Sequence, residues 1–377
     1  MIKILLLIDY SSEFDRKLLR GLVQYSKENG PWLFYRLPSY YSAMHGEQGI
    51  LRWAKEWKAD AIIGQWNNDT IDLQKELNIP VVLQNYHHRS VTYSNLTGDY
   101  KGTGRMAAQF FAKRMFHNFA YFGINGVVWS DERCEGYRQE VKRIGGEFFS
   151  FESDKQEDEI RMEVSQWLQQ LPKPVALFCC DDAHALFISE TCKMTNIPIP
   201  EEIALLGVDN DELMCNISDP PISSIELEVE RGGYSIGRLI HQQIKKEHEG
   251  TFNIVINPIR IELRQSTEKH NIKDPYILEV VKYIESQYSS DLTIESLLAN
   301  IPLSRRNFEV KFKNALNTSI YQYILNCRCN HLADLLLTTD RPLADLAMEV
   351  GFTDYNNIAR IFKKFKGCSP IEYRQKK

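Results

Sequence analysis

Up to about residue 265, short apolar runs rich in β-branched and aromatic residues alternate with amphipathic stretches that have the period of a helix. Such alternation is typical of βαβ units, and it predicts a parallel sheet covered by helices. The first helical stretch begins after Ser11 and Ser12, which can cap it, and ends at Asn29-Gly30. The predicted strands are 2–8, 32–37, 61–66, 81–85, 119–124, 148–151, 175–180 and 203–208.

The pattern changes after Arg264. A polar stretch leads to Asp274-Pro275, a typical helix start, and beyond it apolar residues recur only with a helical period. The predicted helices are 275–288, 294–300, 305–315, 320–337, 343–350 and 355–366. A chain of 377 residues is too long for one hydrophobic core. We therefore expect an α/β domain at 1–267, a linker at 268–274 and an all-helical domain at 275–377.

The net charge of -5 is distributed unevenly along the chain. From Ser304 to the end there are 13 Lys or Arg and 7 Asp or Glu, so this segment carries +6 and the residues before it carry -11. A basic segment in an otherwise acidic chain indicates a surface that binds nucleic acid.

The cysteines and the N-terminal residues exclude other classes of protein. The eight cysteines lack the spacing of a disulfide framework or a zinc site, so we expect free thiols, no metal and no cofactor. The apolar run 4–8 is too short to span a membrane, and no cleavage site follows it. These features predict a cytoplasmic protein that has no contact with membranes.

Two segments of the helical domain, 294–312 and 343–365, share one plan: a short apolar helix, a tight turn and a helix rich in polar and basic residues. This is the plan of a helix-turn-helix motif. In the second segment Gly351 supplies the turn and Asp354 can cap the next helix. The helix at 320–337, about 27 Å long, can place both motifs in successive major grooves. The alternative is a helical dimerisation domain with a solvated basic face.

Residues that read DNA have to lie on the exposed face near the start of the second helix of each motif. Phe308 and Phe312 are expected to point inward in the first motif, as are Ile358 and Phe362 in the second. The exposed residues that we expect to contact DNA are Ser304, Arg305, Arg306 and Glu309 in the first motif, and Tyr355, Asn356, Asn357, Arg360, Lys363 and Lys364 in the second.

The second motif and the residues after it resemble the signature of the AraC family. The matching residues are Ala344-Asp345-Leu346-Ala347, Val350-Gly351-Phe352, Arg360-Ile361-Phe362-Lys363-Lys364, Gly367, Ser369-Pro370 and Tyr373-Arg374. The resemblance covers about 100 residues. It implies two helix-turn-helix motifs bridged by a long helix, in a regulator that binds double-stranded DNA.

Ligands of open α/β units bind at the loops beyond the carboxyl ends of the strands. In this chain those loops combine carboxylates, amides and a guanidinium with aromatic rings, which suits a sugar, because hydroxyls take paired hydrogen bonds and a sugar ring stacks on an aromatic face. Asp182 is expected to cap a helix instead. The candidate ligand-binding residues are Asp9, Tyr10, Phe14, Trp66, Trp129, Arg133, Asp181 and Asp209, with Asn67 and Asn85 in the same loops.

The first domain resembles the effector domain of the lactose-repressor family. The resemblance is carried by Asp99-Tyr100 with Gly102 and Gly104, by Arg133 before Gly136-Tyr137, and by Cys180-Asp181-Asp182, Gly207-Val208-Asp209-Asn210, Pro220-Pro221 and Arg264-Gln265-Ser266-Thr267. It implies a two-lobed fold of the periplasmic-binding-protein type. It also implies that Arg133, Asp181 and Asp209 hold the hydroxyls of a sugar.

A lactose-repressor-like sensor followed by an AraC-type domain resembles the regulators of xylose operons over the full length. This resemblance implies a regulator that activates pentose genes in response to D-xylose. The partners we expect are tandem DNA half-sites, the sugar, RNA polymerase and a second copy in a homodimer. No catalytic motif is evident, so we expect no enzyme activity. The alternative is a solute-binding protein that delivers a sugar to a transporter, which the basic C-terminal segment disfavours.

Overall fold

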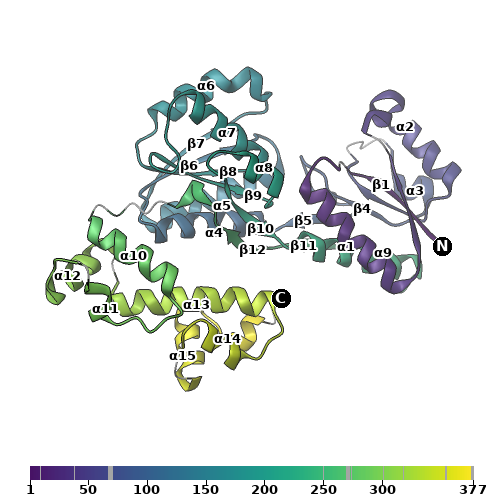
Figure 1. Cartoon of the computed structure of the whole chain (residues 1–377). Coiled ribbons are helices and arrows are strands. Elements are labelled where there is room, and N and C mark those ends of the chain that lie inside the picture. The colour runs from purple at the N-terminus through teal and green to yellow at the C-terminus, as the bar shows by residue number, and fades with distance from the viewer. Residues whose placement is uncertain are drawn as a thin grey trace. The chain divides into compact units, whose positions relative to one another are not determined.

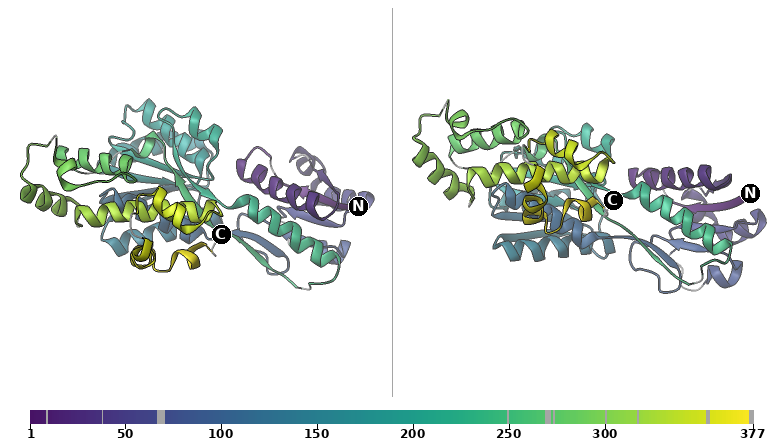
Figure 2. Two further views of the ribbon diagram at one scale, coloured as in Figure 1. Left: turned by 60° about the horizontal axis from the view of Figure 1, so that its bottom comes forward. Right: turned by 90° about the horizontal axis from the view of Figure 1, so that it is seen from below.

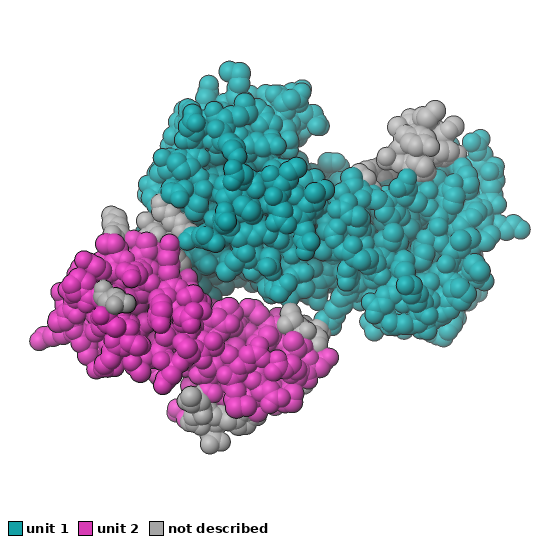
Figure 3. Space-filling model, in the orientation of Figure 1, with its two compact units in different colours: residues 1–269 teal, residues 270–377 magenta. Residues whose placement is uncertain are grey.

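The computed structural model describes residues 1–377 except 9, 38, 67–70, 249, 269–271, 273, 300, 317, 353–354 and 375–377, and the side chains of 39–45, 74, 338, 355 and 356 are also left undescribed. The chain divides into two compact units, Met1–Lys269 and His270–Lys377 (Figure 3). The predicted linker, 268–274, lies across this division, and most of it falls outside the described residues.

The first unit contains two six-stranded sheets (Figure 1). The first sheet has the order β11-β5-β4-β3-β1-β2, and all its neighbouring strands are parallel. Helices α1 and α9 cover one face, where Leu18 and Ile236 are buried, and α2 and α3 cover the other. The elements of this lobe are β1 (Ile2–Leu7), α1 (Glu13–Asn29), β2 (Trp32–Arg36), α2 (Ser39–Trp57), β3 (Ala61–Gly64), α3 (Leu73–Leu77), β4 (Val81–Leu83), β5 (Ser94–Gly98), α9 (Val229–Ile244) and β11 (Asn253–Ile256).

The second sheet has the order β12-β10-β9-β8-β6-β7, and only β12 is antiparallel to its neighbour. Phe111 of α4 and Tyr137 of α5 pack on one face, and Val164 of α6 and Ile188 of α7 pack on the other. The elements of this lobe are α4 (Tyr100–Lys113), β6 (Asn118–Gly123), α5 (Val128–Ile144), β7 (Glu147–Glu152), α6 (Glu157–Gln170), β8 (Val175–Cys179), α7 (Asp182–Met194), β9 (Ile203–Val208), α8 (Glu212–Ile217), β10 (Ser223–Leu227), β12 (Pro258–Glu262) and the short helix η1 (Gln265–Thr267).

The chain passes between the two lobes three times: from β5 to α4, from β10 to α9 and from β11 to β12. Backbone hydrogen bonds tie these crossings together, from Asp99 N to Ile256 O at 2.9 Å and from Glu228 N to Asn257 O at 3.0 Å. Three adjacent segments of this kind are typical of a hinge between two lobes.

The described residues of the second unit form helices joined by turns and loops, with no strand among them (Figure 2). Its helices are α10 (Pro275–Gln287), α11 (Ile294–Leu298), α12 (Arg305–Leu316), α13 (Ile320–Thr338), α14 (Leu343–Glu349), α15 (Tyr355–Lys366) and α16 (Pro370–Arg374). Asp274 caps α10 by accepting hydrogen bonds from Tyr276 N and Ile277 N, as its position before a proline suggests. Among the described residues, no helix is both long and apolar enough to cross a membrane.

The predicted fold class is confirmed, and all eight predicted strands are present. The sequence did not predict β5, β10, β11, β12 or α16. Strand β5 reads SNLTG, yet Ser94, Asn95 and Thr97 are buried. Their polar groups find partners there: Asn95 Nδ2 donates to Asn253 Oδ1 at 3.0 Å, and Ser94 Oγ accepts from Phe252 N at 3.1 Å. Tertiary hydrogen bonds therefore bury a strand that has no apolar pattern.

Candidate ligand cleft and nucleic-acid interface

Arg133 is the central residue at the carboxyl edge of the second sheet. It lies on α5, and its side chain is only 4% exposed. Its Nη1 donates to the carbonyl oxygen of Cys180, and its Nη2 lies 3.7 Å from Oδ1 of Asp209. The guanidinium also lies 5.4 Å from the ring centre of Trp129. These contacts hold the Arg133 side chain in one position, so little side-chain entropy remains to be lost there.

Two polar atoms of this group are buried without a hydrogen-bond partner among the described residues: Nε of Arg133 and Oδ1 of Asp209. A buried polar group that lacks a partner costs about 1 to 3 kcal/mol. One is a donor and the other is an acceptor. A ligand hydroxyl can donate and accept at once, so it can satisfy both.

Asp209 follows β9 in a strained backbone conformation. Its φ is 99° and that of Asn210 is 50°, values that few residues other than glycine adopt. Burial raises the pKa of Asp209 to about 6, although Arg133 acts in the opposite direction. Strain and an altered pKa at the carboxyl end of a strand are typical of a functional site.

The two acidic residues after β8 differ in their roles. Asp181 caps α7, since its Oδ1 accepts from His184 N at 2.8 Å and lies 2.7 Å from His184 Nδ1. Burial opposes ionisation of Asp181, but His184 and Arg133 outweigh it and lower its pKa. The expectation that Asp182 caps a helix is wrong: it is buried, and it accepts from Ser224 Oγ at 2.6 Å and from Asp211 N at 2.8 Å. Burial, followed by the charge of Asp209, raises the pKa of Asp182 well above its ordinary value.

The first lobe contributes α1, which contacts residues 209–211 of the second lobe. Lys17 Nζ donates to the carbonyl oxygen of Asp209 at 2.7 Å, and Arg16 pairs with Asp211 at 3.3 Å. Tyr10 and Phe14 precede these two residues and are partly buried against the core. Burial raises the pKa of Tyr10 to about 12, so its hydroxyl is neutral and can donate a hydrogen bond.

The remaining candidates of the first lobe are less well placed. Trp66 is only 4% exposed, because its ring packs with Leu73 and Leu83 in the core and its Nε1 donates to Ile71 O. Little of its surface is left for stacking on a ligand. Asn85 uses its Oδ1 to accept from Trp66 N. Asp9 and Asn67 lie outside the described residues.

A loop of the first lobe, residues 84–93, contacts the start of α5 in the second lobe. Arg89 forms a paired salt bridge with Glu132 at 2.6 and 2.8 Å, and Val128 N donates to Tyr86 O at 2.7 Å. The ring of Tyr86 lies edge-on to Trp129, with 6.3 Å between their centres. Sequence reasoning missed this connection, because no local pattern shows which distant residues meet. It also missed His184, which lies only three residues after Asp181.

The second unit presents the two helix-turn-helix motifs. Phe308 and Phe312 are fully buried in the first, and Ile358 and Phe362 are buried in the second, as predicted. Leu332 of α13 packs with the core of the second motif. With 19 residues, α13 is about 28 Å long, which is close to the spacing of successive major grooves.

The residues proposed to contact DNA are placed as follows. Arg305 pairs with Glu295 at 2.8 Å and with Glu309 at 3.1 Å, whereas Arg306 is exposed and has no ion-pair or hydrogen-bond partner in the described part of the chain. Ser304, Lys363 and Lys364 are exposed, and Lys364 Nζ also donates to Gln322 Oε1 at 2.8 Å. Arg360 is exposed and donates to Asn357 Oδ1 at 2.9 Å. Asp354 and the side chains of Tyr355 and Asn356 lie outside the described residues.

Known proteins share both parts of this arrangement. Residues 108–267 match the family of periplasmic binding protein-like domains, and residues 297–376 match a helix-turn-helix domain family. The xylose operon regulatory protein of Escherichia coli (strain K12) is 23% identical over 385 residues, which cover 99% of this chain and 96% of that protein. The protein of the same name from Haemophilus influenzae is 24% identical, with 99% and 98% covered.

A solved structure of the xylose-binding transcription activator xylR matches with a TM-score of 0.61 and 22% identity, over 99% of this chain and 97% of that one. It shows that the fold is shared from end to end. The two matched domains agree with the exposed basic residues on helices α12 and α15. The chain is therefore similar, over its whole length, to transcription regulators in which a periplasmic binding protein-like domain precedes an AraC-type, DNA-binding helix-turn-helix domain.

Proposed function

We propose that this regulator binds D-xylose in the cleft between its lobes and, in response, activates genes of pentose utilisation. The observation that carries the proposal is the pair of buried atoms that have no hydrogen-bond partner in the described part of the chain, Nε of Arg133 and Oδ1 of Asp209, beside the ring of Trp129. A donor, an acceptor and an aromatic face are the groups that a sugar ring needs. The names of the two xylose operon relatives support xylose among the pentoses.

We assign Arg133, Asp181 and Asp209 to the sugar hydroxyls and Trp129 to the sugar ring, with Tyr10 and Phe14 completing the site from the first lobe. Closure of the lobes around the hinge then shifts a dimer interface and places two C-terminal units on tandem half-sites, where they contact RNA polymerase. The contacts of Lys17 and Arg16 with residues 209–211, and of Arg89 with Glu132, support this mechanism, because both connect the lobes.

Thermal unfolding of the full-length protein in a panel of pentoses and hexoses tests the proposal. D-xylose is expected to raise the unfolding temperature more than the other sugars, since a ligand at 100 times its Kd stabilises the folded state by about 2.7 kcal/mol. D-ribose, D-glucose and D-galactose are the matched controls. Equal shifts with every sugar, or none with any, would contradict the sugar assignment.

Two variants test the DNA interface. One replaces a residue expected to contact a base, and the other replaces a residue expected to contact a phosphate. Arg306→Ala is expected to weaken binding to the operator by about 1 to 3 kcal/mol and to leave binding to random DNA unchanged, if Arg306 contacts a base. Lys363→Ala should weaken both about equally and lower the salt dependence, because a phosphate contact carries no sequence information. Gel shifts on a sugar-operon promoter and on random DNA measure both. Identical behaviour of the two variants would refute this division of roles.

A further inference from the structure

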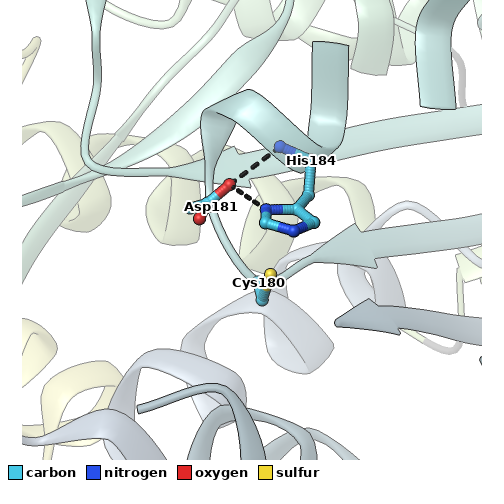
Figure 4. A group of neighbouring side chains, drawn as sticks. All are labelled: Cys180, Asp181 and His184. Atoms are coloured by element: carbon cyan, nitrogen blue, oxygen red, sulfur yellow. Dashed lines mark hydrogen bonds and ion pairs between the residues drawn. The ribbon is translucent and has the colours of Figure 1, made fainter. Parts of the chain in front are cut away.

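Three side chains at the junction of β8 and α7 offer different metal-binding atoms within a small volume. The Sγ of Cys180, a carboxylate oxygen of Asp181 and an imidazole nitrogen of His184 all lie within 4.8 Å of one another. Figure 4 shows Asp181 and His184 side by side and the sulfur of Cys180 directed toward the imidazole ring. Among the described residues, this is the one group of three such ligands that meets this distance.

The local structure explains why the group is so compact. Cys180 is the first residue after β8, Asp181 caps α7, and His184 lies in the first turn of that helix. The cap bond from His184 N to Asp181 Oδ1, at 2.8 Å, fixes the position of the histidine relative to the aspartate. The usual zinc spacings separate two cysteines by two residues, so the sequence pattern of this chain did not indicate a metal.

The donor types select the class of ion. A thiolate, an imidazole and a carboxylate together suit zinc and its neighbours among the divalent transition metals, whereas calcium and magnesium prefer oxygen ligands alone. Three protein ligands leave a fourth position of a tetrahedral site for water.

The charges around the group are also compatible with a divalent cation. A Cys180 thiolate and the Asp181 carboxylate together balance a charge of 2+. Arg133 donates to the carbonyl oxygen of Cys180, but the positive charge of Arg133 is balanced by the carboxylate of Asp209 at 3.7 Å. The N-terminus of α7 disfavours a cation, and the two anionic ligands have to outweigh it.

A redox-sensing thiol is the competing explanation for Cys180. Reactive cysteines are partly exposed and have lowered pKa values. Cys180 is fully buried. Oxidants therefore have little access to its thiol, which disfavours a redox-sensing role.

We propose that Cys180, Asp181 and His184 bind a divalent transition metal ion of the zinc type, as a second input to the regulator. Asp181 is also assigned to the sugar under the proposed function, so the metal and the sugar compete for one carboxylate. The predicted competition between metal and sugar rests on the assignment of Asp181 to the sugar. The metal site itself does not depend on that assignment.

Titration of the full-length protein with Co²⁺, followed by absorption spectroscopy without sugar, tests the site. Cobalt bound by a thiolate gives a sulfur-to-metal charge-transfer band and the visible absorption of tetrahedral Co²⁺. Cys180→Ala is expected to abolish the charge-transfer band and to weaken binding more than about tenfold, since even residues behind the ligands contribute about that much. His184→Gln should weaken binding to a similar extent.

The neighbouring Cys179 provides the matched control. It is equally buried, but it belongs to the core on the opposite face of the sheet, so Cys179→Ala removes a thiol without removing a ligand. Circular dichroism checks that each variant is folded. A charge-transfer band that survives in Cys180→Ala, or a wild-type protein that does not bind Co²⁺, would overturn the site.

The same titration in saturating D-xylose tests the competition. The apparent cobalt affinity is expected to fall as the sugar concentration rises. Simultaneous binding of both would overturn the shared role of Asp181 but not the metal site. A protein that binds cobalt and no sugar would contradict the proposed function alone, so the two failures are distinguishable.

Discussion

Arg133→Ala is expected to reduce the affinity for the sugar by roughly 30-fold to 4,000-fold, which corresponds to about 2 to 5 kcal/mol. Two effects add. The variant removes the guanidinium Nε, which has no hydrogen-bond partner among the residues that the structure describes, and it leaves the carboxylate of Asp209 without its counter-charge at 3.7 Å. Isothermal titration calorimetry with D-xylose measures the loss.

Arg138→Ala is the control for this variant. Arg138 lies on the same helix, but its side chain is 58% exposed, and its one ion-pair partner among the described residues is Glu135. Its replacement should leave the affinity for the sugar within experimental error, because exposed ion pairs contribute little. An unchanged affinity in Arg133→Ala would show that the ligand binds elsewhere.

Arg133 also holds the carbonyl oxygen of Cys180, so the alanine variant could lose affinity through a local change in structure. Asp209→Asn addresses the same pair with a side chain of nearly equal size. It keeps an acceptor but removes the charge that Arg133 faces, so the affinity should fall while the thermal stability without sugar is retained. If both variants are folded and both lose affinity for the sugar, the loss is due to the missing ion pair between Arg133 and Asp209.

Phe362→Ala is expected to abolish binding to promoter DNA while the sensor still binds its sugar. Phe362 is fully buried among α13, α14 and α15, and truncation of a buried phenylalanine costs about 3 to 5 kcal/mol. A single helix-turn-helix motif has few other contacts to compensate, so the second motif should unfold. Gel shifts measure the loss of DNA binding, and calorimetry measures the sugar affinity of the same preparation.

Met348→Ala on α14 is the matched apolar control, because its side chain is 69% exposed. It should bind promoter DNA as the unchanged protein does. If Phe362→Ala also bound DNA normally, the second motif would not be a DNA reader. If Phe362→Ala lost sugar binding as well, the two units would not fold independently.

The elements of the fold were largely predictable, because they depend on local patterns. Strands such as Val175–Cys179 and Ile203–Val208 are continuous apolar runs that are buried on both faces, as expected for central parallel strands. In the second unit Phe308 and Phe312 repeat at helical spacing and both point inward. Periodicity failed where burial depends on distant partners, as with Ser94 and Asn95 of β5.

The candidate site was predictable in its residue types and less so in its arrangement. Arg133 and Asp209 were expected at the cleft, and the structure brings them together from α5 and from the end of β9. Trp66 was expected beside them, but its ring packs into the core, because its Nε1 finds an acceptor at Ile71. No feature of the sequence indicated that His184 would pair with Asp181 beside the thiol of Cys180.

By itself the sequence determined the order of helices and strands, the basic character of the last hundred or so residues and the division into an α/β and a helical part, since these follow from the period of apolar residues and the distribution of charge. Only the tertiary structure decided which side chains meet. The partners of Arg133 and Asp182 come from segments up to 76 residues away along the chain, as in the ion pair of Arg133 with Asp209. The packing of the two sheets and their helices sets such distances, and a local pattern contains no information about them.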